Sequence, residues 1–151
     1  MRLVLASIFS ALALLGGGAA VAVADSTPVE DFTLAYKRTG GIAASTQTLA
    51  VRPGRLATAT GSGTSAGRKR SEFPLTVRRV RSLQRSLSRA DLGSIPPAGP
   101  GGCADCYVYD LRYEGHHLEL EEVDVPARLR AVFATLDAII ATHLAAPTAR
   151  G

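Results

Sequence analysis

Two cysteines with chemically useful spacing occur in this chain of 151 residues, Cys103 and Cys106, separated by two residues. Such a pair can form a disulfide, serve as a redox couple or supply half of a zinc site. A redox pair usually opens a helix after a strand, whereas this pair precedes an expected strand. Adjacent histidines on a strand point to opposite faces, so only one of His116 and His117 could complete a zinc site. The sequence therefore favours a disulfide and leaves zinc binding and redox chemistry as alternatives.

The other side chains that could perform catalysis do not form a familiar constellation. No His-Glu-x-x-His segment marks a metalloprotease. Glu119 and Glu121 are expected to share one solvated face of a strand. We therefore expect a protein that is not an enzyme and that binds neither a metal ion nor a cofactor. An enzyme with an unfamiliar site would need Cys106, Asp110 and His116 to gather around one pocket.

The charges of the chain are separated along the sequence, although the net charge is only +4. Residues 68–89 contain eight basic side chains and one acid, whereas residues 105–124 contain seven acids and one base. A basic segment of this kind is either an ordinary solvated helix face or a surface for a polyanion. Anionic polymers of the cell envelope are the expected partner in the second case. Nucleic acid is not expected, because residues 1–24 have the pattern of an export signal. The arginines concerned are Arg78, Arg79, Arg81, Arg85 and Arg89.

The first 24 residues have the pattern of a secretory signal peptide. Arg2 is followed by an apolar run over residues 3–15, and Ala22-Val23-Ala24 provides the small residues that a signal peptidase requires. The alternative is an uncleaved anchor, but residues 16–24 are mostly glycine and alanine rather than strongly apolar. We expect a secreted, extracellular protein without a stable membrane span after cleavage. Residues 25–151 are then one domain, ordered over about 31–145.

The mature chain is predicted to be an α+β domain, with an antiparallel β-sheet packed against two helices in a two-layer sandwich. Alternating apolar residues indicate strands, and the expected segments are 32–37, 46–51, 56–60, 69–75, 107–113 and 117–123. The glycine-rich segment 61–67 lacks Gly-Lys-Ser/Thr and is expected to be a hairpin loop. Helical periodicity begins after Thr76, a suitable cap, and again near Pro126, with Asp124 as a candidate cap.

Three short segments suggest a family. They are Arg38-Thr39-Gly40-Gly41 after the first strand, the tyrosine-rich hairpin of residues 107–118, and residues 124–129 at the start of the last helix. With these segments the stretch from Phe32 to His143 resembles the emfourin (protealysin inhibitor) family, small bacterial inhibitors of thermolysin-like metalloproteases. The resemblance implies a non-enzymatic inhibitor whose partner is a secreted thermolysin-like protease.

An inhibitor of this class fills the cleft of its protease with a rigid loop, because a preorganised loop loses less entropy on binding. Turn chemistry points to two candidate loops, residues 39–44 and the neighbourhood of Cys103 and Cys106. The candidate binding residues are Arg38, Thr39, Gly40 and Gly41. The competing hypothesis is a module that binds an anionic envelope polymer through residues 68–89.

Overall fold

The computed structural model describes residues 28–63, 67–96 and 102–145. The predicted signal peptide lies outside these residues. Within them, no helix combines the length and the apolar character needed to cross a membrane.

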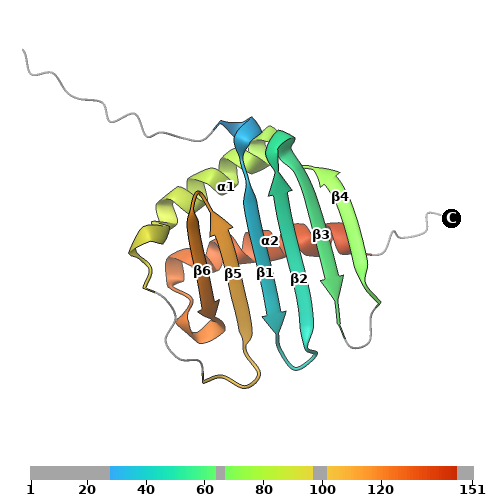
Figure 1. The fold of residues 1–151 in the computed structure, drawn as a ribbon, viewed down its shortest axis with the longest axis vertical. Coiled ribbons are helices and arrows are strands. Elements are labelled where there is room, and N and C mark those ends of the chain that lie inside the picture. Colours follow the sequence, from blue (N-terminus) through green and yellow to red (C-terminus); the bar gives the residue numbers. More distant parts are fainter. Residues whose placement is uncertain (1–27, 64–66, 97–101, 146–151) are drawn as a thin grey trace, which may run out of the picture.

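Six antiparallel strands form one sheet in the order β4-β3-β2-β1-β5-β6 (Figure 1). Strands β1 to β4 are neighbours in the sheet and pair consecutively as hairpins. Strand β5 then pairs with the other edge of β1. The strands are β1 (Leu34–Gly40), β2 (Ser45–Arg52), β3 (Leu56–Ser62), β4 (Lys69–Pro74), β5 (Tyr107–Tyr113) and β6 (His116–Glu121).

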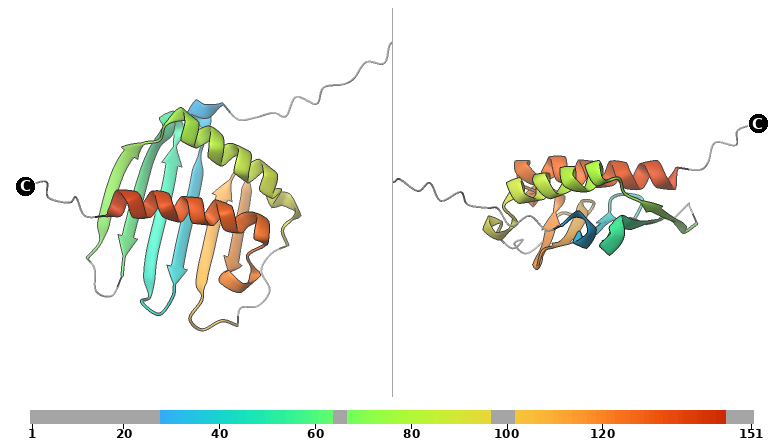
Figure 2. Two further views of the ribbon diagram at one scale, coloured as in Figure 1. Left: turned by 180° about the vertical axis from the view of Figure 1, so that it is seen from behind. Right: turned by 90° about the horizontal axis from the view of Figure 1, so that it is seen from above.

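Two helices, α1 (Val77–Ala90) and α2 (Ala127–Leu144), cover one face of the sheet, and no helix among the described residues lies on the opposite face (Figure 2). Four short 3-10 turns complete the described elements: η1 (Val29–Asp31), η2 (Pro53–Arg55), η3 (Leu92–Ser94) and η4 (Glu122–Asp124). The predicted α+β sandwich is thus confirmed.

The core lies between the sheet and the helices, and strand alternation selects its members. Leu34 and Tyr36 of β1 face the helices with Leu49 of β2, because the register pairs Tyr36 with Leu49. Leu136 and Ile140 of α2 are completely buried against this layer. Burial of such side chains stabilises a fold by about 1.5–3 kcal/mol each.

The helix starts show where local sequence signals succeeded and where they failed. The Thr76 hydroxyl caps α1 by accepting a hydrogen bond from the Arg79 N–H, at 3.2 Å, as predicted. Asp124 does not cap α2, contrary to expectation; it ends η4, and Pro126 occupies the N-cap position. The first strand also runs from Leu34 to Gly40, whereas the sequence predicted a strand over residues 32–37.

Candidate functional site

Both loops that the sequence singled out meet at one end of the sheet. The Gly41 N–H donates a hydrogen bond to the Cys106 carbonyl, with 3.4 Å between nitrogen and oxygen. The turn η4 lies at the same end, because Glu122 accepts a hydrogen bond from the Tyr107 N–H at 3.3 Å. We call residues 40–44, 102–106 and 122–124 the loop end; in Figure 1 it is the lower end of the sheet.

The predicted disulfide is confirmed. Cys103 and Cys106 are bonded, with 5.4 Å between their Cα atoms. Closing so short a loop stabilises the fold by about 2 kcal/mol on the chain-entropy model. Glu121 adds a further restraint, because its carboxylate accepts a hydrogen bond from the Gly102 N–H at 3.3 Å. The sequence had treated this carboxylate as simply solvated.

The structure rules out the zinc alternative that combined these cysteines with a histidine. Cys103 and Cys106 precede β5, whereas His116 pairs with Tyr113 at the opposite end of that strand. The turn between Tyr113 and His116 joins β5 to β6 at the end of β5 that lies away from the cysteines. The same separation means that the structure does not gather Cys106, Asp110 and His116 around one pocket.

Arg38, the first of the candidate binding residues, lies on the helix side of the sheet and stabilises the loop end. Its guanidinium donates to the Asp137 carboxylate at 2.6 Å and to the Gln47 side chain at 2.8 Å. It also lies over the Tyr107 ring, 4.5 Å from the ring centroid. Only 19% of the Arg38 side chain is exposed. The charge of Arg38 is therefore neutralised by Asp137 within the protein. The sequence reasoning did not identify Asp137 as its partner.

A cluster of aromatic side chains supports this ion pair. The Tyr36 hydroxyl donates to Asp137 at 2.8 Å, and the ring of Tyr109 stacks on Phe133 with 4.7 Å between centroids. Burial raises the pKa of Tyr36, and the nearby negative charge of Asp137 raises it further. Burial likewise raises the pKa of Tyr109. Both phenols therefore remain neutral, and Tyr36 remains a hydrogen-bond donor, at physiological pH.

Gly40 and Gly41 allow the two loops to touch. Both have positive φ angles, +110° and +71°, which favour glycine. A Cβ atom at Gly41 would lie 2.8 Å from the Tyr107 ring, and one at Gly40 would lie well inside 3.0 Å of the Cys106 carbonyl oxygen. Thr39 points to the uncovered face, in register with Thr46 and Val108. The two glycines thus fix the shape of the loop end.

The side chain that this scaffold presents to solvent is Ile42, at the tip of the β1–β2 loop. Ile42 is 95% exposed, the highest value among the large exposed hydrophobic residues of the described chain. Val123 in η4 is 64% exposed and borders a groove of about 480 Å³ together with Cys106, Glu122 and Arg130. The sequence reasoning did not single out Ile42, although a lone isoleucine between a glycine pair and alanines is a visible signal for it.

The sequence reasoning, which found no familiar catalytic constellation, overlooked one serine motif. Residues 63–67 spell Gly-x-Ser-x-Gly, which in α/β-hydrolases places a nucleophilic serine at a turn from a strand into a helix. Here the segment connects β3 to β4, two paired antiparallel strands, and no helix follows it directly. The connection does not have the topology of a nucleophile elbow. Residues 64–66 themselves lie outside the described part of the chain.

The fold and the loop end define a small two-layer α+β protein with one uncovered sheet face and a braced, exposed loop tip. No family model matches the chain, and the comparison with curated proteins finds no match.

Proposed function

We propose that this protein is an exported, non-enzymatic inhibitor that blocks a partner protein with its loop end. The partner class implied by the emfourin resemblance is a thermolysin-like metalloprotease. The observation that carries the proposal is the exposure of Ile42 at the tip of a loop whose base is held from several sides.

Ile42 has the properties of an interface anchor. Apolar side chains that fill a pocket of the partner contribute much of the binding energy at protein interfaces. A solvent-exposed isoleucine gains this energy on transfer from water, about 25 cal/mol per Å² of buried apolar surface. Isolated exposed apolar residues are common on protein surfaces, so the argument depends on what holds Ile42 in place.

The base of the loop is restrained by independent contacts. The disulfide closes the neighbouring segment, and the Gly41–Cys106 hydrogen bond joins the two loops. Arg38 links the Tyr107 ring to Asp137 of α2. A loop that is already ordered loses little conformational entropy when it enters a cleft, so more of the contact energy appears as affinity. This is the physical requirement for a loop that inhibits by occupying an active site.

The test is a titration of the purified protein against a thermolysin-like protease, with residual peptidase activity as the readout. We expect stoichiometric loss of activity with the wild type. Ile42→Asp should raise the inhibition constant at least about thirtyfold, because it places a charge in an apolar pocket. Ile42→Leu should change it little.

Val77→Asp is the matched control, because Val77 is an exposed apolar residue on α1, away from the loop end. It should inhibit as the wild type does. Undiminished protease activity at a severalfold excess of wild-type protein would contradict the inhibitor proposal. Equal inhibition by wild type and Ile42→Asp would contradict the assignment of the loop.

The arginine-rich face of α1 favours a second candidate function, binding of an anionic envelope polymer. Its guanidinium groups are exposed, and none of them takes part in an ion pair among the described residues. The buried side of the same helix, with Val80, Leu83 and Leu87, keeps these groups on the outside. The arginines are Arg78, Arg79, Arg81, Arg85 and Arg89.

Replacing two of these arginines separates the two candidate functions. Arg81→Gln combined with Arg85→Gln should weaken binding to heparin, a soluble polyanion, by about thirtyfold at low salt, since each charge near an anionic surface contributes about 1 kcal/mol. Binding of the wild type should fall steeply between low and physiological salt. Ile42→Asp should leave it unchanged. Salt-independent binding, or none, would contradict this candidate.

A further inference from the structure

The uncovered sheet face brings together three metal-ligating side chains from two neighbouring strands. The register pairs Asp110 of β5 with Glu119 of β6, and His117 lies two residues from Glu119 on the same face. The His117 Nε2 atom is 3.3 Å from the Asp110 carboxylate. One donor atom from each residue lies within 4.8 Å of the other two.

We propose that Asp110, His117 and Glu119 bind a divalent transition-metal ion of the zinc class. An imidazole nitrogen with two carboxylate oxygens is a ligand set that Zn²⁺ accepts, at about 2.0–2.2 Å from the metal. Neighbouring donors on a tetrahedral zinc lie about 3.4 Å apart, so rotamer changes of the exposed side chains are enough to close the site. The two carboxylates balance the charge of the ion, and water completes its coordination.

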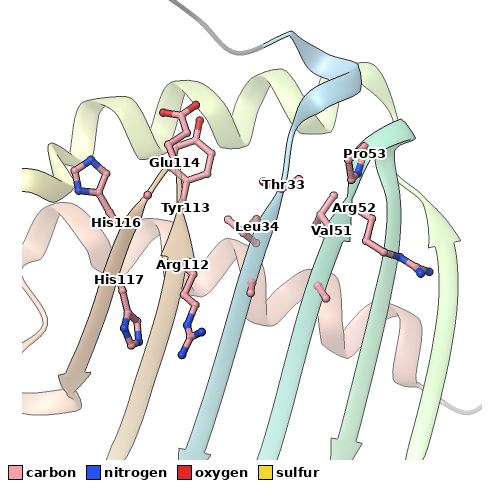
Figure 3. Close-up of a pocket in the computed structure, with 13 residues that line it drawn as sticks. Thr33, Leu34, Val51, Arg52, Pro53, Arg112, Tyr113, Glu114, His116 and His117 are labelled. Atoms are coloured by element: carbon pink, nitrogen blue, oxygen red, sulfur yellow. The ribbon is translucent and has the colours of Figure 1, made fainter.

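Successive side chains of β6 point to opposite faces of the sheet, so only one of its two histidines can join the proposed metal site. Figure 3 shows His117 beside Arg112 over the sheet, whereas His116 points away from them. His117 and Arg112 also border a shallow depression of about 570 Å³, whose lining includes the small side chains of Ala35 and Ala50. The depression leaves room next to His117 for a hydrated ion.

Two cations compete with a metal for Asp110. The Arg112 Nε atom is 3.5 Å from the Asp110 carboxylate, and Lys37 is the residue opposite Asp110 on β1. A metal ion bound to the same carboxylate oxygen would compete with the Arg112 contact for its negative charge. Removing the Arg112 charge should therefore tighten metal binding, and the His117→Asn and His116→Asn variants distinguish this site from non-specific attraction of a cation to the surface.

The experiment is isothermal titration of the purified, tag-free protein with Zn²⁺ in a buffer that does not chelate the metal. Wild-type protein should bind one ion, and the visible spectrum of bound Co²⁺ should report its coordination. His117→Asn and Asp110→Asn should each weaken binding at least tenfold, whereas Arg112→Gln should strengthen it. His116→Asn is the matched control and should bind as the wild type does.

Three outcomes would overturn the proposal: no binding by the wild type at millimolar Zn²⁺, equal binding by His117→Asn, or equal loss in His116→Asn. Circular dichroism of each variant verifies folding, and the three ligand side chains are at least partly exposed. The three ligand side chains lie outside the loop end, on the uncovered face of β5 and β6, and the metal titration is read out separately from the inhibition assay.

Discussion

Gly40→Ala should lower the free energy of unfolding by more than about 3 kcal/mol, a large share of what a domain of this size has. Two effects add. The φ angle of +110° lies in a region that L residues rarely adopt, which costs about 1–3 kcal/mol. The added Cβ also meets the Cys106 carbonyl oxygen, which the disulfide segment holds in place, and overpacking of this kind costs about 1–3 kcal/mol.

Gly54→Ala is the control that separates the two effects. Gly54 has a φ angle of +78°, yet a Cβ atom there would have no neighbour within 4 Å. Only the backbone strain of about 1–2 kcal/mol should therefore appear. Chemical denaturation of both variants measures the difference. Equal stability losses in the two variants would show that the contact between the loops is not close.

The close contacts of Gly40 and Gly41 also determine which residue should be replaced to test the inhibitor proposal. Alanine at Gly40 or Gly41 would change the structure of the loop end together with its surface, and any loss of inhibition would have two explanations. Ile42 has its side chain in solvent, so its replacement changes the contact surface and leaves the fold intact.

Asp137→Ala should destabilise the protein by about 2–4 kcal/mol, although alanine is the better helix former. The variant removes the hydrogen-bond acceptor of Tyr36, which is 2% exposed, and the ionic partner of Arg38. Leaving a largely buried guanidinium without its partner accounts for most of the loss. Because Arg38 also contacts Tyr107, the loop end should become more mobile and inhibition should weaken.

Thr142→Ala provides the control for helix propensity, because Thr142 lies on the exposed side of α2 and bonds only the Ala138 carbonyl of its own helix. It should change the stability by no more than about 0.5 kcal/mol. A cycle with Arg38→Met and Asp137→Ala, followed by thermal unfolding, isolates the ion pair. If the stability losses of the two single variants simply add in the double variant, the proposed coupling between Arg38 and Asp137 is contradicted.

Much of the architecture follows from local patterns in the sequence. Alternation placed Tyr36 and Leu49 on core faces, and the period of the apolar residues located both helices. Thr76 marked the start of α1 because its hydroxyl can satisfy a free N–H of the first turn. Asp124 carried a similar signal and did not act as a cap, since η4 and Pro126 determine the entry into α2.

The candidate sites depend on contacts between residues far apart in the chain, which local patterns do not encode. Asp137 is 99 residues from Arg38 and appears in the sequence only as an acid within the apolar face of a helix. Asp110 and His117 come together because β5 and β6 pair in one register, and a shift of one residue would have separated them.

The sequence by itself determined the fold class, the faces of the main elements and the disulfide, because each depends on spacing along a few neighbouring residues. Only the tertiary structure decided that β5 pairs with β1, and this pairing joins the Gly40–Gly41 turn to the disulfide segment at one end of the sheet. It likewise decided that Arg38 points inward and Ile42 outward. These outcomes depend on how the whole sheet packs against the two helices. That packing is set by contacts between residues far apart in the chain, which the spacing of apolar residues does not predict.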